Sequence, residues 1–359
     1  MIKRYRILVV STPIGTLGSG EGGGVELTLV SIVAVLLLRG HELTILAKKG
    51  SSLPVDCQAA TLKTFDGENQ CSWQNGTRTE LIQIPDNGLL PKFWGWVLQE
   101  QEKFDLILNL SYDWLPFWIT PYVSTPIFHL VSMGSVSESM DRVINNVACW
   151  DQRRLAFHTR TQACDFALPQ APIIVGSGFD IDTYHFSLSP ESHFGWVGRI
   201  TPEKGLEDAA IVASRLGVKL KVWGLKENTS YANKVENSVP PGIISWEGFL
   251  PGTKLQKVLS SCQCLLNTPK WNEAFGNVTV EAMACGVPVL AYNRGGPGEL
   301  VKSGINGWLV PPDDIMALTE VAYRIKDINR LRTRQWAKDN FSRSAFALRL
   351  ETWFTAGLK

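Results

Sequence analysis

Apolar and polar residues alternate along the chain in blocks that have the lengths of strands and helices. The short run Arg6–Val10 is apolar and β-branched, which predicts a buried strand. The longer apolar run from Val25 predicts a helix that ends at Arg39 and Gly40, where a basic residue and a glycine suit a helix C-terminus. A second strand at 42–47 completes a strand–helix–strand unit, so the sheet is expected to be parallel.

The same alternation continues to about residue 175. Further strands are predicted at 81–85, 105–110, 126–131 and 172–175, with helical stretches at 93–103 and 158–168. Residues 176–192 then lose this periodicity and gain Gly, Ser and Pro, which predicts a linker.

A second block of alternating strands and helices follows the linker. Strands are expected at 193–200, 219–224, 243–250, 264–269, 287–292 and 307–312, with helices between them and a helical C-terminus from Leu331 to Phe354. The prediction is an α/β protein with two Rossmann-like domains, 1–172 and 173–337, whose last helix, about 338–359, packs back on the first domain. The length of 359 residues suits two domains.

Composition excludes several classes of protein. The net charge is +1 and the basic residues are scattered, which argues against nucleic-acid binding. No signal peptide precedes the first strand, and no apolar run reaches the roughly 18 to 20 residues of a membrane span. Seven cysteines are an odd number for a disulfide framework, so reduced thiols and a cytoplasmic location are expected.

A glycine-rich loop lies between the first strand and the first helix. Gly18, Gly20 and Gly23 satisfy the dinucleotide fingerprint, but so many neighbouring glycines can produce this spacing by chance. The second strand ends at Lys48 and Lys49 instead of an acid, so NAD is disfavoured and an NADP-dependent oxidoreductase stays open as an alternative.

Two cations follow the first strand of the second block. Gly198 lets a ligand approach the strand end, and Arg199 and Lys204 present positive charges about one helical turn apart. A diphosphate needs such a pair, because Arg grips it bidentately and Lys neutralises charge that develops on a leaving group. A solvated helix start is the alternative reading.

The stretch from Trp271 to Gly286 carries two acids around a Phe-Gly-Asn turn. Glu273 is expected in the loop, Asn277 at the N-cap of a helix, and Glu281 about one turn further on. The start of this helix is a natural seat for an anion, and Glu281 is placed to accept hydrogen bonds from ligand hydroxyls.

Asp180 and Asp182 resemble a metal-binding DxD pair, but they fall in the linker without further ligands, so turn formation explains them better. His129 ends the apolar run at 126–129 on a predicted sheet edge, where a lone histidine is more often a core residue.

In the whole chain, the order of these motifs resembles the retaining glycosyltransferases of family 4. The matching residues are Gly23-Gly24-Val25-Glu26, His129, Gly198-Arg199, Glu203-Lys204-Gly205, Glu273, Phe275-Gly276, Glu281 and Gly295-Gly296-Pro297-Gly298-Glu299. The resemblance implies a GT-B fold, in which two Rossmann-like domains face each other across a cleft, with no required cofactor or metal.

The resemblance also implies roles for these residues. It assigns Arg199 and Lys204 to the donor diphosphate, with backbone contacts from Gly23 and Gly24. Glu273 would bind the hexose and Glu281 the ribose. The donor set implied in this way is Gly23, Gly24, Gly198, Arg199, Lys204, Phe249, Leu250, Glu273, Phe275, Gly276, Asn277 and Glu281. His129 would lie beside the sugar, as a catalytic residue with Arg199, Lys204 and Glu273.

Within the family, the chain resembles small cyanobacterial enzymes that transfer glucose from UDP-glucose to tetrahydrobiopterin. A flat pteridine suits the aromatic loop after the strand 105–110, so Tyr112, Asp113, Trp114 and Met133 are the candidate acceptor residues. The expected partners are a small-molecule donor and acceptor, without nucleic acid or membrane span, for a monomer or homodimer. Another sugar, glycan or lipid acceptor, and a non-catalytic sensor of nucleotide sugars, stay open.

Overall fold

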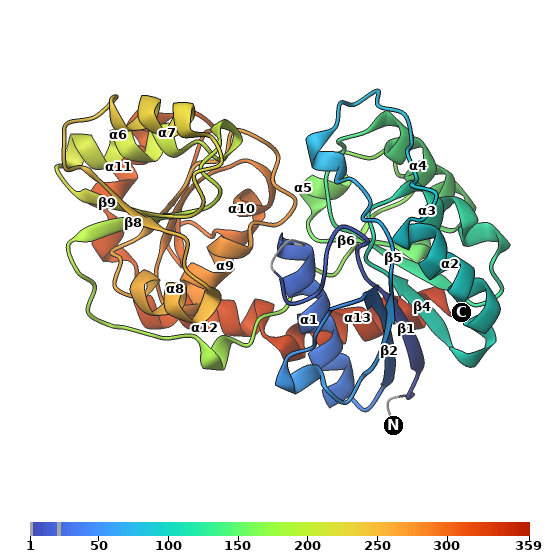
Figure 1. The fold of residues 1–359 in the computed structure, drawn as a ribbon. Coiled ribbons are helices and arrows are strands. Elements are labelled where there is room, and N and C mark those ends of the chain that lie inside the picture. Colours follow the sequence, from blue (N-terminus) through green and yellow to red (C-terminus); the bar gives the residue numbers. More distant parts are fainter. Residues whose placement is uncertain (1–2, 20–22) are drawn as a thin grey trace. The chain divides into compact units, whose positions relative to one another are not determined.

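The computed structural model describes residues 3–19 and 23–359 and contains two α/β units (Figure 1). Unit 1 consists of Met1–Gly178 and Arg343–Lys359, and unit 2 of Phe179–Ser342. The chain therefore leaves unit 1 a few residues after the predicted boundary at 172 and returns to it at Arg343.

Unit 1 is built on a seven-stranded parallel sheet in the order β3-β2-β1-β4-β5-β6-β7. The strands are β1 (Arg6–Val10), β2 (Glu42–Lys48), β3 (Thr61–Phe65), β4 (Leu106–Asn109), β5 (Ile127–Val131), β6 (Leu155–Phe157) and β7 (Ile173–Ile174). Because the central strands are buried on both faces, they read as continuous apolar runs.

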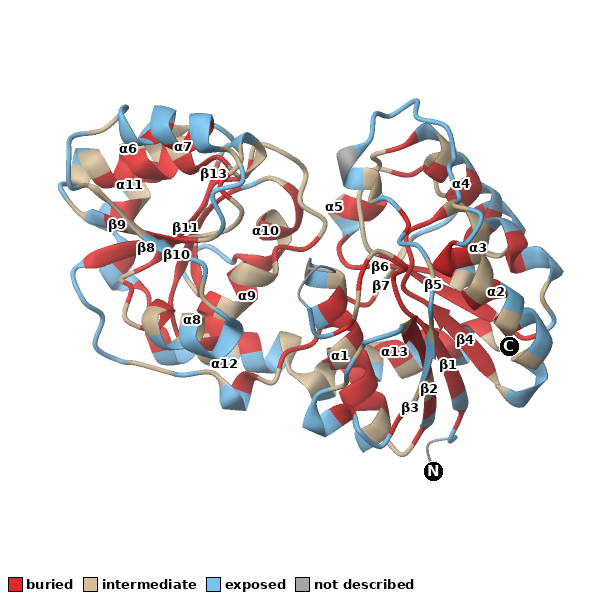
Figure 2. Cartoon of the chain, in the orientation of Figure 1, coloured by how far each residue is buried: buried red, intermediate tan, exposed pale blue. Residues whose placement is uncertain are grey.

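Helices cover both faces of this sheet. They are α1 (Gly23–Leu38), α2 (Leu89–Glu100), α3 (Trp114–Ile119), α4 (Glu138–Asp151), α5 (Arg160–Ala163) and α13 (Arg343–Gly357). α1 and α13 pack on one face, and α2, α3 and α4 pack on the other. In Figure 2 the central strands are buried, whereas the helices carry exposed outer surfaces. Trp353 and Phe354 of α13 meet Phe128 of β5 edge-to-face.

Unit 2 has a six-stranded parallel sheet in the order β10-β9-β8-β11-β12-β13. Its strands are β8 (His193–Val197), β9 (Lys219–Trp223), β10 (Ile244–Gly248), β11 (Leu265–Asn267), β12 (Val289–Tyr292) and β13 (Gly307–Val310). Its helices are α6 (Leu206–Leu216), α7 (Thr229–Glu236), α8 (Gly252–Leu259), α9 (Asn277–Ala284), α10 (Gly295–Leu300), α11 (Ile315–Tyr323) and α12 (Arg330–Phe341). α6, α7 and α11 cover one face of the sheet, and α8, α9 and α12 the other.

Short 3-10 helices occur throughout the chain. They are Val55–Cys57, Trp73–Asn75, Gln101–Lys103, Thr120–Tyr122, Gln152–Arg154, Ile181–Thr183, Pro202–Lys204 and Ile325–Asp327.

The predicted fold class, α/β with two parallel sheets, is confirmed. The strand predicted at 81–85 is wrong, because this segment pairs with no strand and Leu81 is 80% exposed. The strand Thr61–Phe65 was not predicted, because it is an edge strand with largely exposed polar side chains.

Within residues 3–19 and 23–359, no helix is both long and apolar enough to cross a membrane. All seven cysteines are free thiols.

Candidate active site

The ammonium group of Lys204 lies against the carboxylate of Glu273 in unit 2. Its Nζ donates a hydrogen bond of 2.8 Å to Glu273 Oε1, and each side chain is only 17% exposed. The same ammonium lies 5.0 Å from the centre of the Trp271 ring, a cation–π contact. The sequence did not single out Trp271, although an aromatic residue just before the acidic loop was the available signal.

Gly205 allows the two segments to approach so closely. Its φ is +65°, and a Cβ at this position would lie 1.9 Å from the carbonyl oxygen of Thr268. The Thr268 hydroxyl donates to the Gly205 carbonyl at 2.7 Å, and the Lys270 amide donates to the Glu203 carbonyl at 2.8 Å. Only glycine fits here, so the backbone itself places Lys204 beside Glu273.

Arg199 follows β8 and Gly198, at the carboxyl edge of the sheet. Its guanidinium lies 3.4 Å from both Glu203 and Glu227, and its side chain is 41% exposed. These long contacts to exposed acids hold the guanidinium weakly, so it is available to an anionic ligand.

The prediction that Asn277 is an N-cap is wrong. The cap of α9 is Gly276 with φ +89°, and Asn277 is the first helical residue. The Asn267 amide nitrogen donates to the Thr279 hydroxyl at 2.7 Å, which joins the end of β11 to the first turn of α9.

Glu281 lies one turn into α9 and is half-buried. Its carboxylate has no hydrogen bond or ion pair with any residue that the structure describes. Burial raises the pKa of Glu281 to about 7, and Tyr184 and Cys285 lie close enough for its charge to act on them. A carboxylate left without a protein partner in this position is suited to ligand hydroxyls.

The glycine pair Gly295-Gly296 packs against the backbone of the loop that carries Glu273. The Gly296 amide donates to the Glu273 carbonyl at 2.6 Å, and a Cβ on Gly296 would lie 2.0 Å from the Phe275 carbonyl oxygen. The glycines at the start of α10 therefore fix the backbone that carries Glu273.

A second polar network joins the loops after β11, β12 and β13. Lys270 donates to the buried carboxylate of Asp208 and, at 3.0 Å, to Asp313. Arg294 also donates to Asp313 at 3.2 Å, and the Tyr292 hydroxyl donates to Asp208. These residues were missed from the sequence, because Lys270, Arg294 and Asp313 look like ordinary loop charges, whereas Asp208 lies in α6 and Tyr292 in β12.

The loop after β10 contains Phe249 and Leu250 of the donor set that the resemblance implies. Phe249 is 64% exposed, and Leu250 is half-buried. Beside them, the ammonium of Lys226 lies 4.0 Å from the centre of the Trp246 ring. The Phe249 ring of this loop is thus exposed.

In unit 1, the start of α1 is joined to the glycine-rich loop. The Gly18 amide donates to the buried Glu26 carboxylate, and the Thr28 hydroxyl donates to the Gly24 carbonyl at 2.9 Å. Gly23 is the first residue of α1, whereas Gly20 of the fingerprint lies outside the described residues.

The two lysines that favoured NADP already have protein partners. Lys48 donates to Asn69 at 2.8 Å, and Lys49 forms an ion pair of 3.2 Å with Asp66.

The expectation that His129 lies at an open sheet edge is contradicted. The residue is in the middle of the interior strand β5 and is 0% exposed. Nδ1 lies 3.0 Å from the Asn109 amide nitrogen, Nε2 lies 2.7 Å from the Thr120 hydroxyl, and the ring stacks on Phe117. Burial lowers its pKa to about 3, so the ring is a neutral core residue.

The structure brings the candidate acceptor residues together. Tyr112, Trp114 and Met133 belong to one apolar cluster, and the Tyr112 hydroxyl donates to the Gly134 carbonyl at 3.1 Å. Asp113 is the N-cap of α3 and accepts from the Trp114 amide at 2.8 Å. Burial raises the pKa of Asp113 to about 7. Tyr112 and Asp113 are mostly buried, so they support the site more than they line it.

Asp182 is paired with Lys338 at 2.7 Å. Over the described residues, no group of three or more His, Cys, Asp or Glu side chains is arranged to hold a metal ion.

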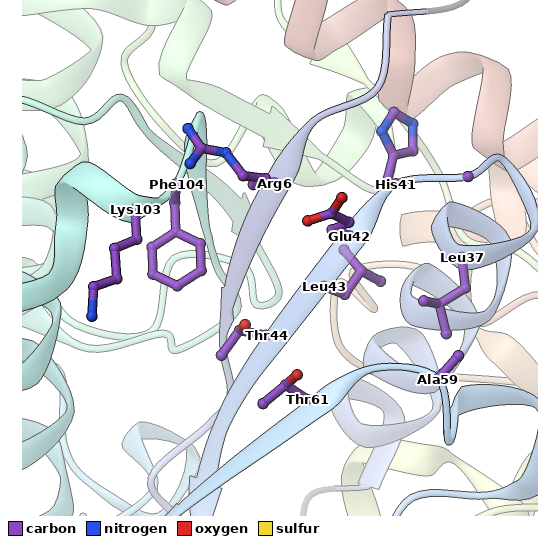
Figure 3. Close-up of a pocket in the computed structure, with 11 residues that line it drawn as sticks. Arg6, Leu37, His41, Glu42, Leu43, Thr44, Ala59, Thr61, Lys103 and Phe104 are labelled. Carbon is purple, nitrogen blue, oxygen red and sulfur yellow. The ribbon is translucent and has the colours of Figure 1, made fainter.

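A cavity of about 440 Å³ lies in unit 1 at the amino ends of β1, β2 and β3. Figure 3 shows Arg6, Glu42, Thr44 and Thr61 around it. Ligands of parallel α/β sheets bind at the carboxyl ends of the strands. Arg6 is also engaged by Asp105 at 3.0 Å, so this cavity is separate from the candidate site.

Two parallel, helix-covered sheets in one chain, with a C-terminal helix that belongs to the first unit, define the GT-B fold class. Residues 186–339 match the family model described as glycosyl transferases group 1.

Named proteins are similar to this chain over most of its length or over a part of it. The D-inositol 3-phosphate glycosyltransferase of Mycolicibacterium smegmatis is 24% identical, over 87% of this chain and 81% of its own. The 2-deoxystreptamine N-acetyl-D-glucosaminyltransferase of Streptomyces fradiae is 32% identical over 36% of this chain and 32% of its own.

Solved structures are similar over nearly the full length. Anabaena HepE in complex with UDP-glucose has a TM-score of 0.73 and 18% identity, covering 98% of this chain and 100% of that one. The sucrose-phosphate synthase of Thermosynechococcus elongatus has a TM-score of 0.76 and 17% identity, covering 98% and 99%. At these identities the likeness establishes the fold.

Proposed function

We propose that the protein transfers glucose from UDP-glucose to a hydroxyl of a small acceptor, with retention of configuration and without a metal ion. The observation that carries this proposal is the pairing of Lys204 with Glu273 at the carboxyl edge of the unit 2 sheet. It combines a cation for the diphosphate with a carboxylate for the hexose hydroxyls. Similarity to a structure that contains UDP-glucose supports the choice of donor.

In this mechanism UDP leaves as the acceptor hydroxyl attacks from the same face of the sugar. Arg199 and Lys204 stabilise the negative charge on the departing diphosphate, and the N-terminus of α9 contributes its dipole. The β-phosphate takes the proton of the acceptor hydroxyl, so no side chain forms a covalent intermediate.

The remaining residues bind and orient the donor. Glu273 accepts hydrogen bonds from the hexose, and Glu281 accepts them from the ribose hydroxyls. Phe249 and Leu250 border the uracil, and Gly23 and Gly24 offer backbone amides. His129 has no catalytic role, because both of its ring nitrogens are engaged inside unit 1.

The proposed acceptor is a pteridine, tetrahydrobiopterin, whose side-chain hydroxyl is the nucleophile. The aromatic residues at the start of α3 support this choice, because flat rings stack on aromatic side chains. The relatives reported above are named for cyclitol acceptors, and D-inositol 3-phosphate is therefore the second candidate.

A thermal-shift panel with UDP, GDP, ADP and NADPH tests the donor, because a ligand that binds the folded state raises Tm. UDP is expected to give the largest shift, whereas a shift with NADPH alone would favour an oxidoreductase. Incubation with UDP-glucose and each acceptor then tests transfer. The coupling constant of the anomeric proton in the product reports the configuration, and chelator is expected to leave the rate unchanged. UDP binding without transfer to any acceptor would indicate a sensor.

A further inference from the structure

Three aromatic rings form an exposed row at α3 and the 3-10 helix after it. Trp114, Trp118 and Tyr122 are four residues apart, so they lie on the same side of the helical segment. The Trp114 and Trp118 rings stack with centroids 5.4 Å apart at 18°, and the Trp118 and Tyr122 rings lie 5.5 Å apart. Trp118 is 48% exposed and Tyr122 is 72% exposed.

A pocket of about 290 Å³ lies between this row and α4. Besides Trp114 and Trp118, its lining residues are Ile82, Ser139, Arg142, Val143 and Asn146. The four α4 residues have the spacing of one helix face. Both helices start just after the carboxyl ends of β4 and β5, where ligands of parallel sheets bind.

The polar groups on the α4 side of this pocket have no protein partner. In the part of the chain that the structure describes, Arg142, Asn146 and Ser139 make no side-chain hydrogen bond or ion pair. The adjacent Asp141, in contrast, accepts from Arg78 at 2.9 Å and from Ser135 at 2.7 Å. The pocket is therefore lined by aromatic rings on the α3 side and, on the α4 side, by hydrogen-bond donors that have no partner among the described residues.

We propose that the pocket between α3 and α4 binds a planar heteroaromatic ring that stacks on Trp118 and accepts hydrogen bonds along one edge from Arg142 and Asn146. This inference rests on the proposed function, since the ring is that of the acceptor. A volume of about 290 Å³ is at the lower end of the ~300–1,000 Å³ typical of ligand pockets, so it suits one small ring system.

The assignment changes which residues contact the acceptor. Trp118, Arg142 and Asn146 recognise its ring, whereas Tyr112 and Asp113 hold the start of α3 in place. Arg142 is the one charged side chain among the lining residues, and its planar guanidinium matches a carbonyl and a ring nitrogen side by side.

Binding of biopterin to the purified full chain, followed by quenching of pteridine fluorescence, tests the pocket directly. Trp118→Ala is expected to raise Kd about tenfold, because stacking on an aromatic side chain stabilises a bound base to about that extent. Trp150→Ala is the matched control, since Trp150 is 50% exposed and does not line the pocket. Arg142→Ala is expected to weaken binding by a similar factor, and Arg142→Lys to restore part of it.

The thermal shift produced by UDP, measured on every variant, reports the donor site separately. Selective loss of biopterin binding in Trp118→Ala and Arg142→Ala, with an unchanged UDP shift, supports the inference. Equal biopterin affinity in all variants overturns it, and transfer to tetrahydrobiopterin by the wild type would then leave the proposed function standing. If the wild type binds no biopterin, the inference also fails, and transfer to D-inositol 3-phosphate would show that the glycosyltransferase function survives with another acceptor.

Discussion

Lys204 and Glu273 are 69 positions apart in the sequence and form a hydrogen-bonded ion pair of 2.8 Å in unit 2. A lysine ammonium has three donor hydrogens, so it can bind a phosphate oxygen without releasing this carboxylate. Glu273 therefore orients the cation in the unliganded protein and still has lone pairs for sugar hydroxyls. In the proposed mechanism the pair connects binding of the leaving group with binding of the transferred group.

Lys204→Ala is expected to lower kcat roughly 10²- to 10³-fold, or about 2.7 to 4 kcal/mol, because it removes a charge that stabilises the departing diphosphate. UDP release from UDP-glucose with saturating acceptor measures this, with circular dichroism as the check on folding. Lys234→Ala on the exposed side of α7 is the control and should keep full activity. Near-normal turnover of Lys204→Ala would contradict the assignment.

The raised pKa of Glu281 should make the free energy of unfolding depend on pH, and Glu281→Gln should remove this dependence. The folded-state pKa of about 7 lies above the ordinary value of 4.5, so the folded state favours the neutral carboxyl. Its contribution to stability is full below pH 4.5 and is lost as the pH rises through about 7. The free energy of unfolding of wild type, measured by urea titration against that of Glu281→Gln, should decline over this window. A constant difference would argue against the buried carboxyl.

Donor binding should show the opposite trend, since only the charged carboxylate accepts hydrogen bonds from both ribose hydroxyls. The affinity of wild type for UDP, relative to Glu281→Gln, should therefore increase from pH 6 to pH 8. Calorimetric titration of both proteins measures it, and the ionisation of UDP itself is common to the two. If the relative affinity does not change with pH, Glu281 does not bind the ribose hydroxyls.

His129→Ala should destabilise unit 1 and leave the chemistry unchanged. It removes the partner of both Asn109 and Thr120 in a fully buried position, at a cost of roughly 3 kcal/mol. Urea unfolding measures the loss, and turnover is measured at low temperature where the variant is folded. His185→Ala, which removes one hydrogen bond to Ser260 from an exposed residue, should cost less. A large loss of kcat at unchanged stability would restore a catalytic role.

Gly205→Ala and Gly217→Ala separate backbone strain from steric clash, because both glycines have φ near +60°. At Gly217 nothing lies within 4 Å of the added methyl group, so the cost is about 1 kcal/mol of left-handed strain. At Gly205 the methyl group would meet the Thr268 carbonyl, and the cost should exceed about 3 kcal/mol. Gly205→Ala should also displace Lys204 and lower kcat. Equal stability and activity of the two variants would show that the close approach of Gly205 to Thr268 does not position Lys204. Thermal unfolding and the transfer assay measure both effects.

The sequence predicted most of the elements that lie in the interior of the sheets. Runs such as Arg6–Val10 and Val289–Tyr292 are apolar because both faces of a central strand are covered. This pattern can be recognised from the sequence of the segment alone. The edge strand Thr61–Phe65 has exposed side chains and no such pattern. The apolar segment at 81–85 was misread, because its hydrophobicity does not come from strand pairing.

The candidate site was predictable where residues close in sequence act together. Arg199, Lys204, Glu273 and Glu281 belong to compact motifs, and the structure pairs Lys204 with Glu273. His129 was misplaced because β5 continues for two residues beyond it, so that it lies in the buried centre of the strand. Trp118 and Arg142 lie on different helices, so their common pocket depends on packing that the linear pattern does not encode.

The last helix, Arg343–Gly357, gives the protein a particular order of folding during synthesis. Unit 2 is an insertion in unit 1, and all of its residues are synthesised before α13. Until then, the face of the first sheet that packs against Phe346, Leu350 and Trp353 lacks part of its cover and exposes apolar surface. Unit 1 therefore cannot complete its core until its final helix has been made, although most of its residues are synthesised before those of unit 2.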